Sequence, residues 1–90
     1  DQEQIAAIYD AYVGRVYAYV RARVPSDQDA EDLTAETFLR AIGGLGRFAP
    51  RHDGAEATWL FRIAHNQVAN HHRAAARRRA LALEELPMEP

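Results

Sequence analysis

Residues 58–79, TWLFRIAHNQVANHHRAAARRR, limit most strongly what this chain can fold into. The apolar residues Leu60, Ile63, Ala64 and Val68 recur there at three- and four-residue spacing, which is the period of one face of an α-helix. The spacing predicts a long helix whose apolar face is buried against the rest of the chain.

A second stripe of this predicted helix adjoins the apolar one and carries different chemistry. At about 100° per residue, one aromatic ring, two amides and three guanidinium groups fall on this side. Arginine binds phosphates, amides bond base edges, and an aromatic ring stacks on an unpaired base. Taken alone, the stripe fits a solvated polar face beside a half-buried tryptophan equally well. Its members are Trp59, Arg62, Asn66, Asn70, Arg73 and Arg77.

The composition predicts one small folded domain. The chain has 90 residues, of which 48% are hydrophobic and 27% charged. It contains no cysteine, which excludes disulfides and thiol chemistry. No apolar run approaches the length of a membrane span and no signal peptide is visible, so we expect a cytoplasmic protein without membrane insertion.

Charge is distributed unevenly along the chain, although the formal net charge is only −2. Residues 1–39 hold eight acidic residues and three arginines, whereas residues 40–83 hold eight arginines and two acidic residues. An acidic front and a basic middle favour two different partners, one of them polyanionic. Ordinary charge scatter is the alternative.

Two further helices are predicted before the long one. Apolar residues recur at helical spacing over residues 2–24, and Pro25 ends that helix. Ser26, with Asp29 three residues later, resembles a capping box and starts a second helix, which we expect to run from Asp27 to Ile42. The side of this helix facing the core is predicted to carry Leu33, Thr34, Thr37, Phe38, Ala41 and Leu45.

The outer side of the second predicted helix carries Asp32, Ala35, Glu36 and Leu39. An exposed leucine beside two carboxylates is typical of a surface that docks another protein. A solvated face is the alternative, because a single exposed leucine needs no explanation.

Glycines are expected to break the second helix, and residues 46–56 to form a loop. Two arginines on this loop could extend a nucleic-acid groove beside the long helix. Asp53 and Glu56 offer a capping box for the start of that helix. The glycines are Gly43, Gly44 and Gly46, and the loop arginines are Arg47 and Arg51.

The apolar pattern decays after Arg79. Residues 80–90 are acidic at their end and contain two prolines. We therefore expect a domain over residues 1–79 and a linker over residues 80–90, leading to a C-terminal part that is absent.

The sequence contains no recognisable catalytic constellation. His65 and His72 share a helix face, but seven residues place them about 10 Å apart along the axis, too far to share one metal ion. His71 and His72 are adjacent and point apart, and His52 is on the loop. No phosphate-binding loop and no nucleophile with a base at recognisable spacing is present. We expect no metal, no cofactor and no enzymatic activity.

Three segments in order carry a family resemblance: DAEDLTAETFLRA at residues 29–41, RF at 47–48, and WLFRIAHNQVANHHR at 59–73. They resemble conserved region 2 of bacterial sigma factors, specifically the extracytoplasmic-function (ECF) group. The resemblance extends from about Ile8 to Arg79. It implies an all-α, three-helix bundle with a long C-terminal promoter-recognition helix.

The resemblance also implies partners for both faces. In this family the second helix binds the clamp helices of the largest subunit of core RNA polymerase. The last helix and the loop before it recognise and open the −10 promoter element, binding its single-stranded non-template strand. The positions that match polymerase binding are Asp32, Ala35, Glu36, Leu39 and Arg40. The positions that match promoter binding are Arg47, Phe48, Arg51, Trp59, Arg62, Asn66, Asn70, Arg73 and Arg77, with Arg47 and Phe48 near the pocket for a flipped base.

Two departures from the family pattern concern these positions. Ala35 stands where the family usually has glutamine, which bears on polymerase docking. The three glycines loosen the end of a helix that the family usually continues, which bears on base capture.

Two hypotheses follow. The first is a sigma-factor domain that gives polymerase its promoter specificity. The alternative is a sigma-like helical domain whose main role is to dock an anti-sigma or other regulatory protein. A helix-turn-helix reader of duplex DNA is disfavoured, because that motif needs a short recognition helix after a tight turn.

Overall fold

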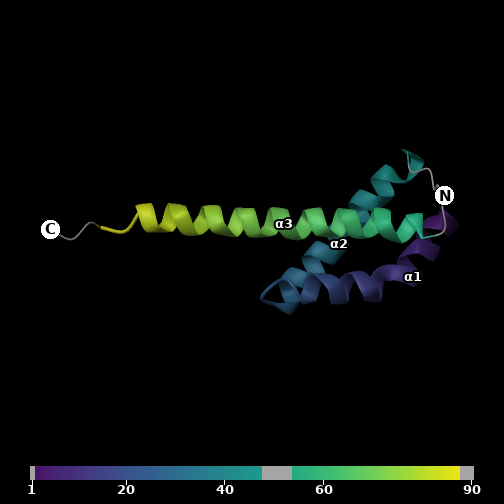
Figure 1. Cartoon of the computed structure of the whole chain (residues 1–90), viewed down its shortest axis with the longest axis horizontal. Coiled ribbons are helices and arrows are strands. Elements are labelled where there is room, and N and C mark those ends of the chain that lie inside the picture. The colour runs from purple at the N-terminus through teal and green to yellow at the C-terminus, as the bar shows by residue number, and fades with distance from the viewer. Residues whose placement is uncertain (1, 48–53, 88–90) are drawn as a thin grey trace.

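A computed structural model describes residues 2–47 and 54–87, and over these residues the chain is helical with no β-strand (Figure 1). Three α-helices and one short 3-10 helix follow one another. They are α1 (Gln2–Arg21), α2 (Asp27–Gly44), η1 (Leu45–Arg47) and α3 (Ala55–Glu84). The prediction of an all-α fold with a long last helix is confirmed.

Helices α1 and α2 form a hairpin with a tight connection. Helix α1 ends at Arg21, three residues before the predicted end at Val24. Val24 precedes Pro25, and a residue in that position is disfavoured in helical conformation. The Arg21 side chain closes the connection by donating to the carbonyl oxygen of Val24 at 2.9 Å and to Oδ1 of Asp27 at 2.6 Å. Val24 is buried in the turn.

The start of α2 is as predicted, but its end is not. The Ser26 side chain accepts a hydrogen bond from the backbone N–H of Asp29 at 3.1 Å, which caps the helix at Asp27. The predicted break at Gly43 and Gly44 is wrong, because both glycines lie inside α2 and η1 follows directly. A glycine in a helix costs only about 1 kcal/mol relative to alanine, and Leu45, just beyond them, packs against the core.

Helix α3 begins three residues earlier and ends five residues later than the predicted stretch 58–79. Its N-cap is Gly54, whose φ of +85° suits glycine. The predicted capping box depends on Asp53, which lies outside the described residues. Strong helix formers after Arg79 carry the helix to Glu84.

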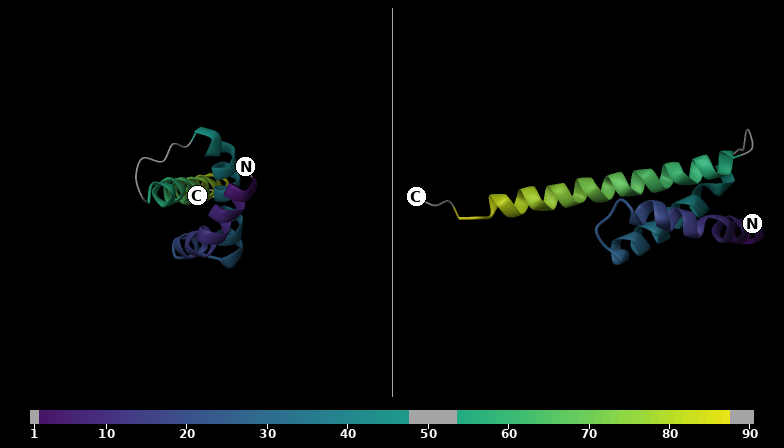
Figure 2. Two further views of the ribbon diagram at one scale, coloured as in Figure 1. Left: turned by 90° about the vertical axis from the view of Figure 1, so that its right-hand side faces the viewer. Right: turned by 60° about the horizontal axis from the view of Figure 1, so that its bottom comes forward.

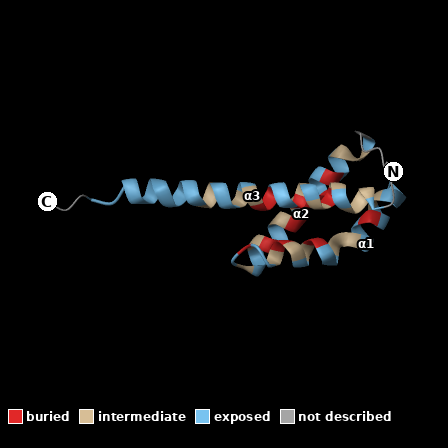
Figure 3. Ribbon diagram, in the orientation of Figure 1, coloured by how far each residue is buried: buried red, intermediate tan, exposed pale blue. Residues whose placement is uncertain are grey.

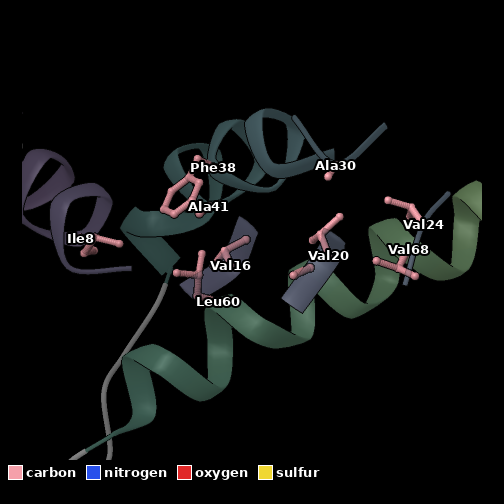
Figure 4. Packing of buried hydrophobic residues seen from close by; sticks show 10 residues of the cluster. Ile8, Val16, Val20, Val24, Ala30, Phe38, Ala41, Leu60 and Val68 are labelled. Carbon is pink, nitrogen blue, oxygen red and sulfur yellow. The ribbon is translucent and has the colours of Figure 1, made fainter. Parts of the chain in front are cut away.

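The core lies where the first half of α3 crosses the α1–α2 hairpin (Figure 4). Val16, Val20 and Leu60 are completely buried at its centre. Of the predicted apolar face of α3, Leu60, Ala64 and Val68 are buried, but Ile63 is only half-buried. The remaining buried apolar residues are Ile8, Val24, Ala30, Phe38 and Ala41.

Beyond the core, α3 projects away from the hairpin (Figures 1 and 2). Thirty residues make a helix about 45 Å long, and the molecule measures 63 × 24 × 21 Å. Every described residue from Ala76 onward is exposed (Figure 3). No helix in the described part of the chain is long and apolar enough to cross a membrane.

Candidate nucleic-acid interface

A groove runs between α2 and α3 and gathers part of the predicted polar stripe. We name it the α2–α3 groove. It has a volume of about 430 Å³, which is in the range of small-ligand sites. From α3 it is lined by Trp59, Ile63, Asn66, Gln67, Asn70 and Arg73, and from α2 by Arg40 and Gly44.

Trp59 is held between two environments. On the core side it lines a small apolar cavity together with Phe38 and Leu45, among others. On the other side it lines the α2–α3 groove. A methyl group on Gly44 would lie 3.6 Å from Cζ2 of Trp59, so the indole packs directly beside the α2 backbone. This anchoring fixes an aromatic ring at one end of the groove.

Amides and guanidinium groups make up the rest of the polar lining. Asn66, Asn70 and Arg73 are exposed on α3. The Arg73 guanidinium donates through Nη2 to Oδ1 of Asn70, which leaves the Asn70 amide nitrogen as a donor. Among the described residues that line the groove none carries a carboxylate, so its electrostatics favour an anion.

The outer side of α2 forms an exposed ridge. Asp32 accepts a hydrogen bond from Gln28 Nε2 at 2.9 Å. Glu36 pairs with Arg40, with 3.1 Å between Oε1 and Nε. Leu39 is 64% exposed, as predicted from its place on the outer side of the helix.

A second groove lies on the α1 side of this ridge, and we name it the α1–α2 groove. Ala35 and Leu39 line it, together with the tyrosine rings of Tyr9 and Tyr17 and the apolar side chain of Val13. The lining is largely apolar and open. Helix α2 therefore has an open, largely apolar groove on one side and a polar, cationic groove on the other.

Comparison with known proteins decides the family. A model of sigma-70 region 2 matches residues 8–78. The chain belongs to the sigma-70 region 2 family.

The relatives of this region 2 domain are bacterial. It is 40% identical over 76 residues to the ECF RNA polymerase sigma factor BldN of Streptomyces coelicolor, which covers 83% of this chain and 28% of the relative. It is 37% identical over 78 residues to the ECF RNA polymerase sigma-E factor of Salmonella typhimurium, covering 87% of this chain and 39% of the relative. These relatives assign the domain to the ECF group.

A shorter match is closer in sequence. Over 42 residues the domain is 55% identical to the ECF RNA polymerase sigma factor SigC of Mycobacterium tuberculosis, covering 47% of this chain and 22% of the relative. The chain thus spans about a fifth to two fifths of the length of these three relatives. No solved structure matches the domain.

The promoter-binding positions implied by the resemblance are not all in one place. Trp59, Asn66, Asn70 and Arg73 line the α2–α3 groove. Arg62 and Arg77 are exposed on α3 but do not line it. Arg47 ends η1, directly after α2. Phe48 and Arg51 lie outside the described residues.

Two groove residues differ from the sequence interpretation. Gln67 is 8% exposed and was missed, because it is a polar residue that falls between Ile63 and Leu60 on the apolar face. Arg40 was placed with the polymerase-binding residues, but it lines the α2–α3 groove. On a helix of about 100° per residue, Arg40 and Gly44 lie to one side of the α2 ridge and Ala35 lies to the other.

Histidines of α3 hold the region 2 domain together at the hairpin. The Tyr19 hydroxyl of α1 and Nδ1 of His65 lie 3.3 Å apart. His72 donates through Nε2 to the carbonyl oxygen of Arg23 at 2.8 Å. Nε2 of His71 lies 3.7 Å from Oδ2 of Asp29 on α2. These contacts attach α3 to the hairpin over about two turns of the same part of α3 that lines the groove.

Proposed function

We propose that this domain binds core RNA polymerase and recognises and opens the −10 promoter element in transcription initiation, without enzymatic activity of its own. The observation that carries the proposal is the α2–α3 groove, where an anchored indole, three amides and two guanidinium groups meet without a carboxylate in the lining. Family membership supports the same function. The site of action is then the cytoplasm, where polymerase works.

The chemistry of the groove favours a single strand over a duplex. An aromatic ring stacks only on a base whose face is exposed, and paired bases in a duplex hide their faces. Trp59 supplies such a ring, and the amides of Asn66 and Asn70 can bond the edge of the same or the next base. Arg73 supplies positive charge for the backbone. We therefore assign the groove to the non-template strand of the opened −10 element.

The α2 ridge and the α1–α2 groove are proposed to bind polymerase. The exposed Leu39 suits an apolar contact, and the carboxylates of Asp32 and Glu36 suit a basic partner. The partner implied by the family is the pair of clamp helices of the largest subunit. Ala35 faces the α1–α2 groove, so the absence of the usual glutamine changes that wall. An anti-sigma protein would compete for the same apolar surface.

Residues 80–90 are proposed to lead toward a C-terminal domain that reads the −35 element. The projection of α3 away from the bundle supports this arrangement (Figure 1). So does the greater length of the relatives, of which this chain covers only part.

The two faces can be tested separately with two variants. Glu36→Arg with Leu39→Asp reverses the charge and removes the apolar contact on the α2 ridge. It should abolish retention on immobilised core polymerase without weakening single-strand binding. Asn66→Ala removes an amide worth roughly 1–3 kcal/mol of base discrimination. It should reduce sequence preference in selection from a randomised single-strand pool and leave polymerase binding unchanged.

Thermal melts control this comparison, since all three side chains are at the surface and should change the free energy of unfolding by less than about 0.5 kcal/mol. Loss of strand binding by the α2 variant with polymerase binding intact would mean that the faces are exchanged. If both variants keep both partners but lose an anti-sigma protein, the regulatory-docking hypothesis replaces this one.

Salt dependence tests the phosphate contact. Affinity for single-stranded DNA should fall with salt, with a slope of about −0.7 per contact in a double-logarithmic plot. Arg73→Gln should flatten the slope by about that amount. Arg78→Gln, which makes the same charge change on the same helix outside the groove, is the matched control. Equal slopes for the two variants would exclude Arg73 as a phosphate contact.

A further inference from the structure

We propose that the strand-binding site is built by two helices, with Arg40 of α2 as a backbone phosphate contact opposite the α3 residues. This proposal rests on the proposed function and extends it to a helix that the sequence assigned to polymerase alone.

Arg40 lies on the α2 side of the groove. Arg40 lines the α2–α3 groove together with Asn66, Asn70 and Arg73 of the facing helix. Gly44, one turn further along α2, lines the same wall, so no side chain stands between Arg40 and the indole of Trp59 on that row of α2. A strand that stacks a base on Trp59 and bonds the amides would pass between the two helices, with guanidinium groups on both sides.

The Arg40 side chain is exposed and keeps N–H donors for a phosphate. Its side chain is 58% exposed, and its ion pair with Glu36 uses Nε. The terminal nitrogens keep their N–H donors, and a guanidinium fork binds phosphate oxygens well. An exposed ion pair one turn apart on a helix is weak, so the pairing with Glu36 leaves Arg40 able to bind a phosphate.

In the free domain, the ion pair between Glu36 and Arg40 weakens strand binding. The Glu36 carboxylate competes with a phosphate for the same guanidinium and adds negative charge near the groove. Removing this charge should therefore strengthen strand binding, and only if Arg40 is present. This dependence separates a phosphate contact at Arg40 from a general change in surface charge.

The experiment measures binding of the whole chain to a fluorescein-labelled oligothymidine strand over a range of salt concentrations. Arg40→Gln should weaken binding and flatten the salt slope by about 0.7, and Arg40→Lys should keep the slope. Glu36→Gln should bind about twofold more tightly, as expected from the strength of such a pair. In the Arg40→Gln background, Glu36→Gln should have no effect.

Arg21→Gln is the matched control. Arg21 is also an arginine of the hairpin paired with a carboxylate, Asp27, but it does not line the groove. Its slope should equal that of the unaltered chain, and melts of all variants verify folding. An unchanged slope for Arg40→Gln, or a Glu36→Gln effect that persists without Arg40, overturns the proposal.

The same measurements distinguish this inference from the proposed function. If Arg73→Gln weakens strand binding and Arg40→Gln does not, the two-helix site is wrong and the α3 site stands. If Arg40→Gln loses retention on core polymerase while its salt slope is unchanged, Arg40 belongs to the polymerase face. If the unaltered chain does not bind the strand at any salt concentration, both proposals fail.

Discussion

Leu60 and Ile63 lie three residues apart on α3 and differ in what surrounds them. Leu60 is completely buried against the hairpin, whereas Ile63 is half-buried and lines the α2–α3 groove. Leu60→Ala should therefore lower the free energy of unfolding by roughly 2–5 kcal/mol. Ile63→Ala should lower it by less than about 2 kcal/mol, because part of its surface is exposed already.

Chemical denaturation of both variants measures this difference directly. Equal losses would mean that the two side chains are buried alike. At this scale the apolar period of α3 predicted Leu60, Ala64 and Val68 correctly as core residues. It misplaced Ile63 because the period gives the direction of a side chain and not the position of the neighbouring helix. Gln67 was missed because the apolar period was counted on apolar residues alone.

Among the helices, α2 shows most clearly what local sequence rules decide. The start at Ser26 was predictable, since the cap is a local hydrogen bond. The end was not, because the packing of Leu45 outweighs the low helix propensity of Gly43 and Gly44. The early start of α3 after Gly54 was not predictable either, since glycine has no side chain that could mark it as an N-cap residue.

The glycines of the chain should respond to alanine in opposite ways. Gly43 lies inside α2 with open space around its Cβ position, so Gly43→Ala should stabilise the fold by about 0.5–1 kcal/mol. Gly54 has a φ of +85°, so Gly54→Ala should destabilise it by roughly 1–2 kcal/mol. Thermal midpoints should move by several degrees, upward for Gly43→Ala and downward for Gly54→Ala. A downward shift for Gly43→Ala would contradict a regular helix there.

For the whole molecule, only the first half of α3 contributes to the buried core, and the second half extends beyond it. All buried residues lie between Ile8 and Val68 in the described ranges, and the helix continues well beyond them. Removal of residues 80–90 should therefore change the free energy of unfolding by less than about 0.5 kcal/mol, because the described residues there are exposed. Urea denaturation with and without this segment measures the change. A larger loss would show that the projecting end stabilises the bundle.

The three-helix architecture was predictable as a whole, because apolar residues recur at helical spacing in each of the three helices. The grouping of side chains into two grooves was not. Arg40 and Ala35 are five residues apart on one helix, and only the positions of α1 and α3 decide which groove each one enters.

The ion pair between Glu36 and Arg40 connects the α2 ridge with the α2–α3 groove. A basic group of polymerase that engages Glu36 would release Arg40 toward the promoter strand. Linkage then requires the reverse, by the same factor: a strand held by Arg40 would leave Glu36 more available to polymerase. One turn of helix would thus make promoter opening and polymerase retention cooperative, so that the domain binds each partner more tightly in the presence of the other.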